Sequence, residues 1–192
     1  MLKILKTTKK SHFGFTLIEL IVGVSMLALV TGIFLANYHG TNKHAELVME
    51  AQKLAANLRT AQSYSLESKK FNDDIPAGGW GIHFDLAASK ESYLIFADID
   101  EPEAEGSKTY DGEAEKLQEF NLPKGITIEE IKMEDDSVWD NVDISFLPPD
   151  PTTNIWDGTD NYNLAQITLK ENAGNTTKVV EVNFFGLINV VD

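Results

Sequence analysis

Gly14-Phe-Thr-Leu-Ile-Glu19 opens an apolar run that continues to about Ala36. Four lysines and no acidic residue precede this run, and the run itself carries a single charge, Glu19. At about 1.5 Å per helical residue it reaches roughly 33 Å, enough to cross a hydrocarbon core of about 30 Å. A carboxylate near the start of such a run is costly, because hydrocarbon disfavours a charge. The stretch therefore predicts a membrane helix whose one charge needs an explanation.

The charge of the 192-residue chain is unevenly distributed. The formal net charge is −14, and outside the leader 12 basic residues stand against 30 acidic ones, a net of −18. Nucleic-acid binding depends on Lys and Arg displacing counterions from phosphates, so we expect no nucleic-acid partner. The chain has no cysteine, which excludes disulfides, thiolate catalysis and cysteine metal sites.

The amino-terminal stretch does not have the order of a cleavable secretory signal. Its apolar run is too long, and Ala36-Asn-Tyr-His-Gly40 offers poor candidates for the small-residue cleavage site that would end it. The lysines favour a cytoplasmic amino terminus, so the rest of the chain would be translocated. A plain signal anchor explains this length and orientation but leaves Glu19 unexplained.

Gly14, Phe15 and Glu19, between a short basic leader and a long apolar helix, resemble the prepilin signal of type IV pilins and type II secretion pseudopilins. The resemblance implies that a prepilin peptidase cuts between Gly14 and Phe15 and methylates the new amino terminus at Phe15. It implies that Glu19 serves assembly, with other pilin or pseudopilin subunits and the inner-membrane assembly machinery as partners. The chain would span the inner membrane once, with its amino terminus in the cytoplasm and its head outside, periplasmic or on a surface filament.

The position of Glu19 agrees with a role in assembly. It follows Phe15 by four residues, about 6 Å along a helix, and is a poorly placed charge in a lone helix. In a bundle it can meet the ammonium group of a neighbour's Phe15, and an opposite charge makes a buried ion tolerable. The alternative is a glutamate that reaches to the membrane interface.

Residues 37–70 predict an amphipathic helix that continues the membrane helix. Apolar residues recur at helical spacing, and the opposite face is polar and includes Glu46 and Glu50. Such a helix is marginal in isolation, so its apolar stripe must pack on a globular domain. The alternative is a separate helix after a loop at residues 39–42. The apolar stripe comprises Leu47, Ala51, Leu54, Leu58, Ala61 and Ser65.

Residues 71–192 predict a β-rich head with short turns, which favours antiparallel pairing. The predicted fold class is α+β: a long amino-terminal helix, transmembrane and then amphipathic, packed on an antiparallel β-sheet head, as in pilins. The chain would divide into a leader (1–14), an assembly helix (15–36), its amphipathic continuation (37–70) and the head (71–192). Acidic or polar loops are predicted at 98–112 and 147–161, and strands at 80–84, 93–97, 116–120, 126–133, 138–146, 165–170, 178–184 and 187–191.

Within the head, residues 79–84, 93–98 and 146–149 are similar to the H-type minor pseudopilins. In that group a glycine usually follows the Phe-x-Pro region, whereas Asp150-Pro151 stands here. The choice between a minor and a major subunit therefore stays open.

Other chemistry is weakly supported by the residues. Residues 98–109 fail the EF-hand pattern, and Asp157-Gly-Thr-Asp-Asn161 is either a calcium site or a solvated turn, so we expect no cofactor unless Ca²⁺ binds there. The four histidines, of which only His83 lies in the head, show no HExxH spacing, and the chain has no P-loop and no G-x-S-x-G. Trp80, Trp139 and Trp156 are expected in the core or at a subunit interface.

These observations predict a structural subunit and not an enzyme. The subunit would belong to a type IV pilus or a type II secretion pseudopilus and would polymerise through its amino-terminal helix. The alternative is a monomeric, signal-anchored binding module with an acidic head outside the cytoplasm. The sequence leaves open which machine the protein serves.

Overall fold

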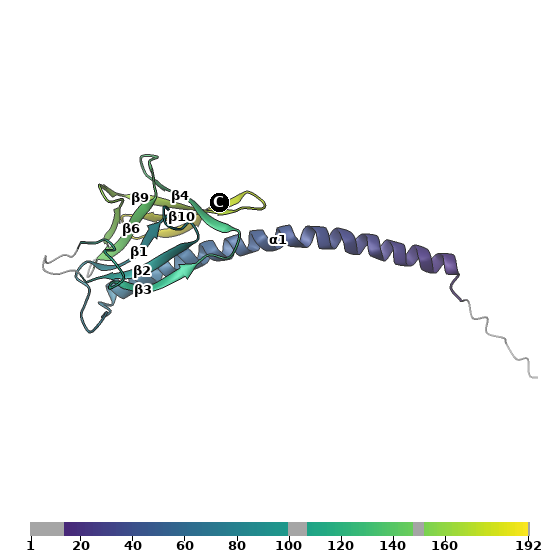
Figure 1. Cartoon of the computed structure of the whole chain (residues 1–192), viewed down its shortest axis with the longest axis horizontal. Coiled ribbons are helices and arrows are strands. Elements are labelled where there is room, and N and C mark those ends of the chain that lie inside the picture. The colour runs from purple at the N-terminus through teal and green to yellow at the C-terminus, as the bar shows by residue number, and fades with distance from the viewer. Residues whose placement is uncertain (1–13, 100–106, 148–151, 192) are drawn as a thin grey trace, which may run out of the picture. The chain divides into compact units, whose positions relative to one another are not determined.

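The computed structural model describes residues 14–99, 107–147 and 152–191 (Figure 1). These residues contain one helix, α1 (Leu17–Leu66), and eleven strands in two antiparallel sheets, which confirms the predicted α+β class. Most of the predicted leader, and parts of the loops predicted at 98–112 and 147–161, lie outside the described residues. The chain divides into two compact units, residues 1–39 and 40–192.

The described part of the first unit is the start of α1. Its segment Leu17–Leu35 is long and apolar enough to cross a membrane, and every side chain in it is exposed. The hydroxyls of Ser25 and Thr31 donate to the carbonyls of Ile21 and Leu27 at 2.7 and 2.8 Å. These polar groups are therefore satisfied within the helix, as an apolar surrounding requires.

In the second unit, α1 continues and buries one face in the head. The helical backbone includes residues 39–42, which removes the alternative of a loop there. The predicted apolar stripe is confirmed. Its buried members are Leu47, Ala51, Leu54, Ala55, Leu58, Ala61 and Ser65.

One residue of the predicted polar face is placed differently. Glu50 is only 7% exposed, because it lies one turn before Leu54 and shares that side of the helix. Its carboxylate accepts a hydrogen bond from the Lys53 ammonium at 3.2 Å, and the head covers the rest of the side chain. The prediction that Glu50 lies on the face opposite the apolar stripe was wrong.

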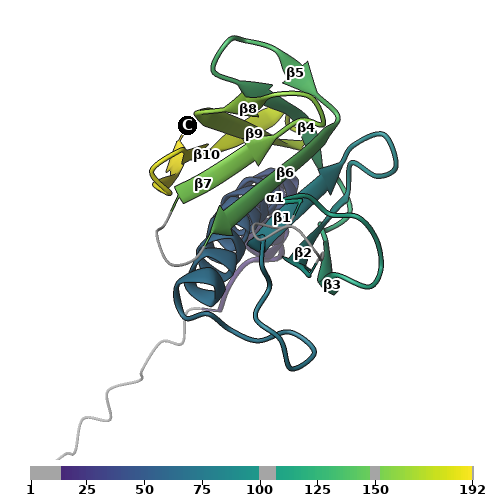
Figure 2. The ribbon, with the colours of Figure 1, turned by 90° about the vertical axis from the view of Figure 1, so that its left-hand side faces the viewer.

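The strands form two sheets that share their core with α1 (Figure 2). The first sheet has the order β3 (Lys116–Asn121), β2 (Ser92–Asp98), β1 (Gly79–Asp85), β6 (Asn141–Leu147), β7 (Thr152–Trp156), β8 (Asn161–Tyr162). The second has the order β11 (Ile188–Val191), β10 (Thr176–Asn183), β9 (Leu164–Glu171), β4 (Ile126–Met133), β5 (Val138–Trp139). Trp80 is buried, and Trp139 packs against the core.

Two strand predictions were wrong. The predicted strand 138–146 is split at Asp140 into β5 and β6, which belong to different sheets: Trp139 pairs with Ile131, and Val142 pairs with Phe84. The chain changes sheet at this point without a glycine or proline that would mark the break. The predicted loop 147–161 contains β7 and the first residue of β8, and Thr153 and Ile155 of β7 alternate into the core despite the polar composition.

The end of α1 is joined to the first sheet through Ser65. Its buried hydroxyl donates to the carbonyl of Phe146 in β6 and accepts the backbone N–H of Trp80 in β1 at 2.9 Å. Gly79 allows this close approach, because its φ is +86° and a Cβ there would lie 2.0 Å from the Phe146 oxygen. Helix and sheet therefore meet at a polar contact inside the core.

We expect Ser65→Ala to lower the free energy of unfolding by about 1–3 kcal/mol, because it leaves the buried Trp80 N–H without its acceptor. Ser63→Ala is the matched control. It removes a hydroxyl that bonds Glu67 at the surface and should change stability by less than about 0.5 kcal/mol. Denaturant unfolding of the full chain in micelles, followed by tryptophan fluorescence, measures both; equal losses would contradict the role of Ser65.

Candidate functional site

Thr16 and Glu19 form a capping box at the start of α1. The Glu19 N–H donates to the Thr16 hydroxyl at 3.3 Å, while the Thr16 N–H and hydroxyl each donate to Glu19 Oε2 at 3.4 Å. This reciprocal arrangement satisfies donors that a helix start leaves unpaired, and the carboxylate lies at the positive end of the helix dipole. Glu19 is therefore better accommodated in a single chain than the sequence analysis expected.

The capping box could have been recognised in the sequence. Thr-x-x-Glu directly before an apolar run is the usual signature of such a helix start. The charge within the membrane run was interpreted only through assembly, so this local role was missed.

The residues predicted for processing lie just before the helix. Phe15 is 83% exposed, and within the described part of the chain no atom other than those of the adjacent residues lies within 4 Å of a Cβ placed on Gly14. Helical structure begins only at Leu17, so the bond between Gly14 and Phe15 is outside the hydrogen-bonded helix. The arrangement is compatible with access by a peptidase, and the roles of Gly14, Phe15 and Glu19 stay predictions.

The surface of the Leu17–Leu35 segment is apolar on all sides. Fourteen large apolar side chains lie exposed between Phe15 and Leu35, and a Cβ placed on Gly23 or Gly32 would meet no atom within 4 Å. An exposed surface of this kind requires lipid or other helices to cover it. Small residues such as these glycines permit close helix packing.

In the head, His83 and Asp143 form a pair beside Tyr110. His83 Nδ1 lies 2.8 Å from Asp143 Oδ1, and the His83 and Tyr110 rings are 4.8 Å apart. Burial raises the pKa of the Asp143 carboxyl above its usual value, although the hydrogen bond from His83 acts in the opposite direction. Burial likewise raises the pKa of Tyr93 nearby to about 12, although Asn57 donates a hydrogen bond to its hydroxyl at 2.9 Å.

His83 lines a depression of about 300 Å³, together with Tyr93, Tyr110 and Lys116. The His83–Asp143 pair joins residues directly opposite each other on β1 and β6 and is not part of a sequence motif of nucleophilic catalysis. Its geometry instead fixes the segment that carries Tyr110 against β1 and β6. Neighbouring bonds do the same, since Ser145 Oγ donates to the Lys108 carbonyl at 3.0 Å.

The oxygen-rich loop at Asp157 is organised as a turn. Asp157 Oδ1 accepts the N–H groups of Thr159 and Asp160, both at 2.7 Å, and Oδ2 accepts the Tyr162 hydroxyl at 2.9 Å. These donors occupy carboxylate lone pairs that a cation would need. Within the part of the chain that the structure describes, no group of three or more His, Cys, Asp or Glu is placed to hold a metal ion. The geometry favours the interpretation as a turn.

We expect Asp143→Asn to change how stability depends on pH. Because burial raises the pKa of Asp143, the folded chain binds this proton more tightly than the unfolded chain. The group then stabilises the fold below the ordinary carboxyl pKa, and this stability is lost as the pH rises through the raised folded pKa. Relative to Asp143→Asn, the wild type should lose melting temperature as the pH rises from about 3 toward 7.

The control for this experiment is Asp160→Asn, which changes an exposed carboxyl group. Its difference from the wild type should vary less over the same pH range. A flat or opposite trend for Asp143→Asn, measured by thermal melts of the full chain, would contradict the assignment of the raised pKa.

Comparison with known proteins adds one finding. Residues 9–35 match the family model described as the prokaryotic N-terminal methylation motif. No curated protein and no solved structure matches the chain. The match covers the start of α1 and does not extend to the head, so the similarity of the head to H-type minor pseudopilins stays a prediction.

Proposed function

We propose that this chain, whose residues 9–35 carry the methylation motif that is the hallmark of type IV pilins and pseudopilins, is a filament subunit. It is made as a prepilin, held in the inner membrane, and polymerised through α1. The observation that carries the proposal is the exposed apolar segment Leu17–Leu35, which lies inside the matched motif. Its third residue, Glu19, forms the capping box with Thr16 at the start of the helix. Lipid covers this surface in a single subunit, and neighbouring helices cover it in a filament.

Processing supplies the partner for Glu19 in this proposal. Cleavage between Gly14 and Phe15 creates an ammonium group at Phe15. The contacts of 3.3–3.4 Å between Thr16 and Glu19 are longer than the roughly 2.7–2.9 Å of strong charge-assisted hydrogen bonds. Among the described residues, Glu19 Oε1 accepts no hydrogen bond, so it is available to the Phe15 ammonium of a neighbouring subunit.

Further features of the chain support a structural role. The acidic body, net −18 outside the leader, argues against DNA as a cargo of the head. The pair of His83 and Asp143 holds a segment of the head in place through the hydrogen bond between the two residues and the ring contact with Tyr110. The filament is either a type IV pilus or a type II secretion pseudopilus, with the chain as a major or a minor subunit.

We expect Gly14→Val to block processing, because a peptidase that cuts after Gly14 must accommodate that residue in its active site. Intact mass measurement of the membrane-extracted chain should show residues 1–14 retained in the variant. The wild type should begin at Phe15 with one added methyl group. Gly23→Val, inside the apolar helix, is the matched control and should be processed normally. A wild-type chain that begins at any other residue would support the alternative of a monomeric, signal-anchored binding module.

We expect Glu19→Ala to be inserted and cleaved normally while its incorporation into filaments falls at least about tenfold, because a buried ammonium group loses its partner. Filaments sheared from cells and quantified by immunoblot measure the yield. Thr16→Val separates the two roles of Glu19, since it removes the capping hydroxyl, worth about 1 kcal/mol, and keeps the carboxylate. Near-normal yield from Thr16→Val supports the ion pair, whereas equal losses in both variants would assign Glu19 to the cap alone.

A further inference from the structure

A turn at the surface of the head exposes large apolar side chains. Residues 184–187, which we call the apolar turn, join β10 to β11. Phe185 is 81% exposed, Leu187 is 56% exposed, and the rings of Phe184 and Phe185 lie 5.5 Å apart in an edge-to-face arrangement. No residue from 182 to 191 is charged, although the chain is strongly acidic. Adjacent exposed apolar side chains of this kind indicate a contact with another molecule.

Hydrogen bonds fix the backbone of the apolar turn. The side-chain oxygen of Asn183 accepts two N–H groups of the turn, both at 3.0 Å. From α1, the side-chain amide of Gln62 donates to the Gly186 carbonyl at 3.0 Å. The exposed side chains therefore stand on a rigid support, and binding through them costs less conformational entropy than binding through a loose loop.

A depression of about 240 Å³, which we call the Ile75 depression, lies at the loop between α1 and β1. Its apolar lining comprises Ile75, which is 53% exposed, Ala77, and the side chains of Phe71 and Ile99, which pack against the core. Two backbone hydrogen bonds between Phe71 and Asp74, at 2.8 and 3.1 Å, close the loop at its rim. The volume is below the roughly 300–1,000 Å³ of pockets for drug-sized ligands, which suits an apolar side chain.

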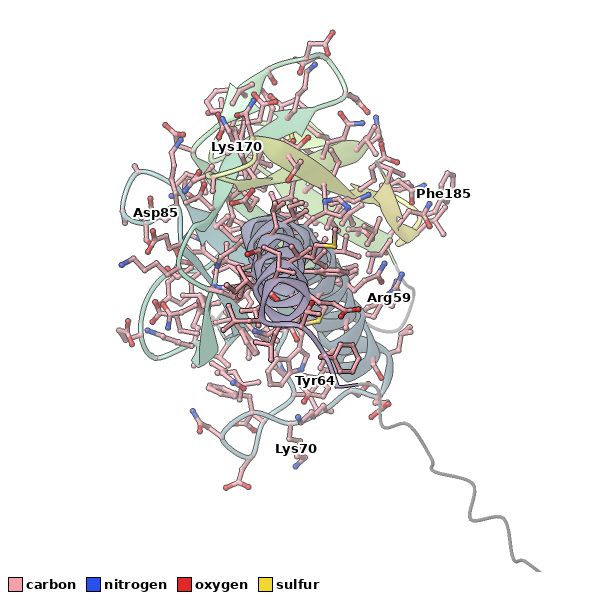
Figure 3. The ribbon with its side chains drawn as sticks, turned by 90° about the vertical axis from the view of Figure 1, so that its right-hand side faces the viewer. Arg59, Tyr64, Lys70, Asp85, Lys170 and Phe185 are labelled. Atoms are coloured by element: carbon pink, nitrogen blue, oxygen red, sulfur yellow. The ribbon has the colours of Figure 1, made fainter. Side chains whose placement is uncertain are left out.

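The apolar turn and the Ile75 depression lie on different flanks of the head. Figure 3 shows Phe185 at one flank, and Lys70, which directly precedes Phe71, at another. When a turn of one copy meets the depression of a second copy, one turn and one depression stay free, so the contact can repeat along a row of subunits. A contact of the turn with the same turn of another copy would instead close a dimer.

The charges beside the two surfaces are complementary. Arg59, the only arginine of the chain, donates to the Ile188 carbonyl at 2.7 Å and thus lies beside the apolar turn. Asp74 is exposed and lines the Ile75 depression. Within the described part of the chain, neither side chain forms an ion pair. Aromatic and arginine side chains are enriched at protein interfaces, and opposite charges select the matching surfaces of two acidic heads.

We propose that the apolar turn of one subunit docks in the Ile75 depression of a second copy of this chain. Phe185 enters the depression, and Arg59 faces the partner subunit's Asp74. The inference rests on the proposed function as a filament subunit and specifies how neighbouring heads meet in the filament. The contact adds to the packing of the apolar segment of α1, which involves a different part of the chain.

The test uses the absence of cysteine from the chain, because introduced cysteines are then its only thiols. Filaments sheared from cells are treated with a short bismaleimide and separated by denaturing electrophoresis. We expect Leu187→Cys combined with Ala77→Cys to give a ladder of dimers, trimers and longer products, and each single variant to stay monomeric. Leu187→Cys combined with Ala87→Cys is the matched control, because Ala87 is also an exposed alanine but lies outside the depression, and it should give no ladder.

The outcomes separate this contact from the proposed function. Filaments of the Leu187→Cys and Ala77→Cys double variant without a ladder would overturn the docking proposal and leave the proposed function standing. Dimers from Leu187→Cys alone would also overturn it, since the turn would then meet its own copy. A wild type that forms no filaments would overturn the proposed function and this inference with it.

Charge reversal tests the same contact without a cross-linker. We expect Arg59→Glu to lower the filament yield at least about tenfold, because two carboxylates then face each other, and the further change Asp74→Arg to restore most of the yield. A loss of head stability would not be repaired by a change on the other flank. Lys124→Glu reverses an exposed charge elsewhere and should give a near-normal yield. Failure of Asp74→Arg to restore the yield, or an equal loss in Lys124→Glu, would overturn the proposal.

Discussion

The buried face of α1 is the contact on which the head depends, because both sheets share it as their core. The face from Leu47 to Ala61 is closed to solvent, and the buried members of the two sheets belong to the same hydrophobic cluster. The chain has no disulfide that could hold the sheets together, so apolar burial and hydrogen bonds carry this task. The Ser65 hydroxyl adds a polar contact at the end of the helix, where Gly79 leaves room for it.

Acidic side chains perform a second structural task in the head. Several buried carboxylates accept backbone N–H groups and thereby fix turns: Glu171 bonds Ala173 and Gly174 at 2.7 and 2.5 Å, and Asp98 bonds Lys108. Asp157 and Asp143 act in the same way on their neighbouring segments. Part of the large negative charge is therefore structural and does not mark a binding or catalytic site. Asp98, the first residue of the acidic loop predicted at 98–112, is fully buried at the end of β2.

Sequence patterns predicted those parts of the fold in which one physical preference acts alone. The 3.6-residue period between Leu47 and Ala61 and the alternation in β9 and β10 each reflect burial on one face, and both were predicted correctly. The predictions failed where tertiary context decides. Asp140 stands where the alternation of Val142, Ile144 and Phe146 would place an apolar residue, but one polar residue does not show by itself that the chain passes from one sheet to the other.

Composition was misleading in other places for physical reasons. The polar segment of β7 was interpreted as a loop, because Thr153 is buried through its position in the sheet and not through its own hydrophobicity. The proposed sites of processing and assembly at Gly14, Phe15 and Glu19, in contrast, lie within six consecutive residues, so the sequence alone could suggest them.

The packing of α1 has a mechanical consequence. In the filament proposed above, tension would enter the head through α1, and this helix is held along the whole stripe from Leu47 to Ser65. A strand peeled from a sheet edge breaks its hydrogen bonds one after another, whereas a buried helix pulled along its axis must break many contacts at the same time. The head is therefore attached in shear, the geometry in which many weak contacts resist force together.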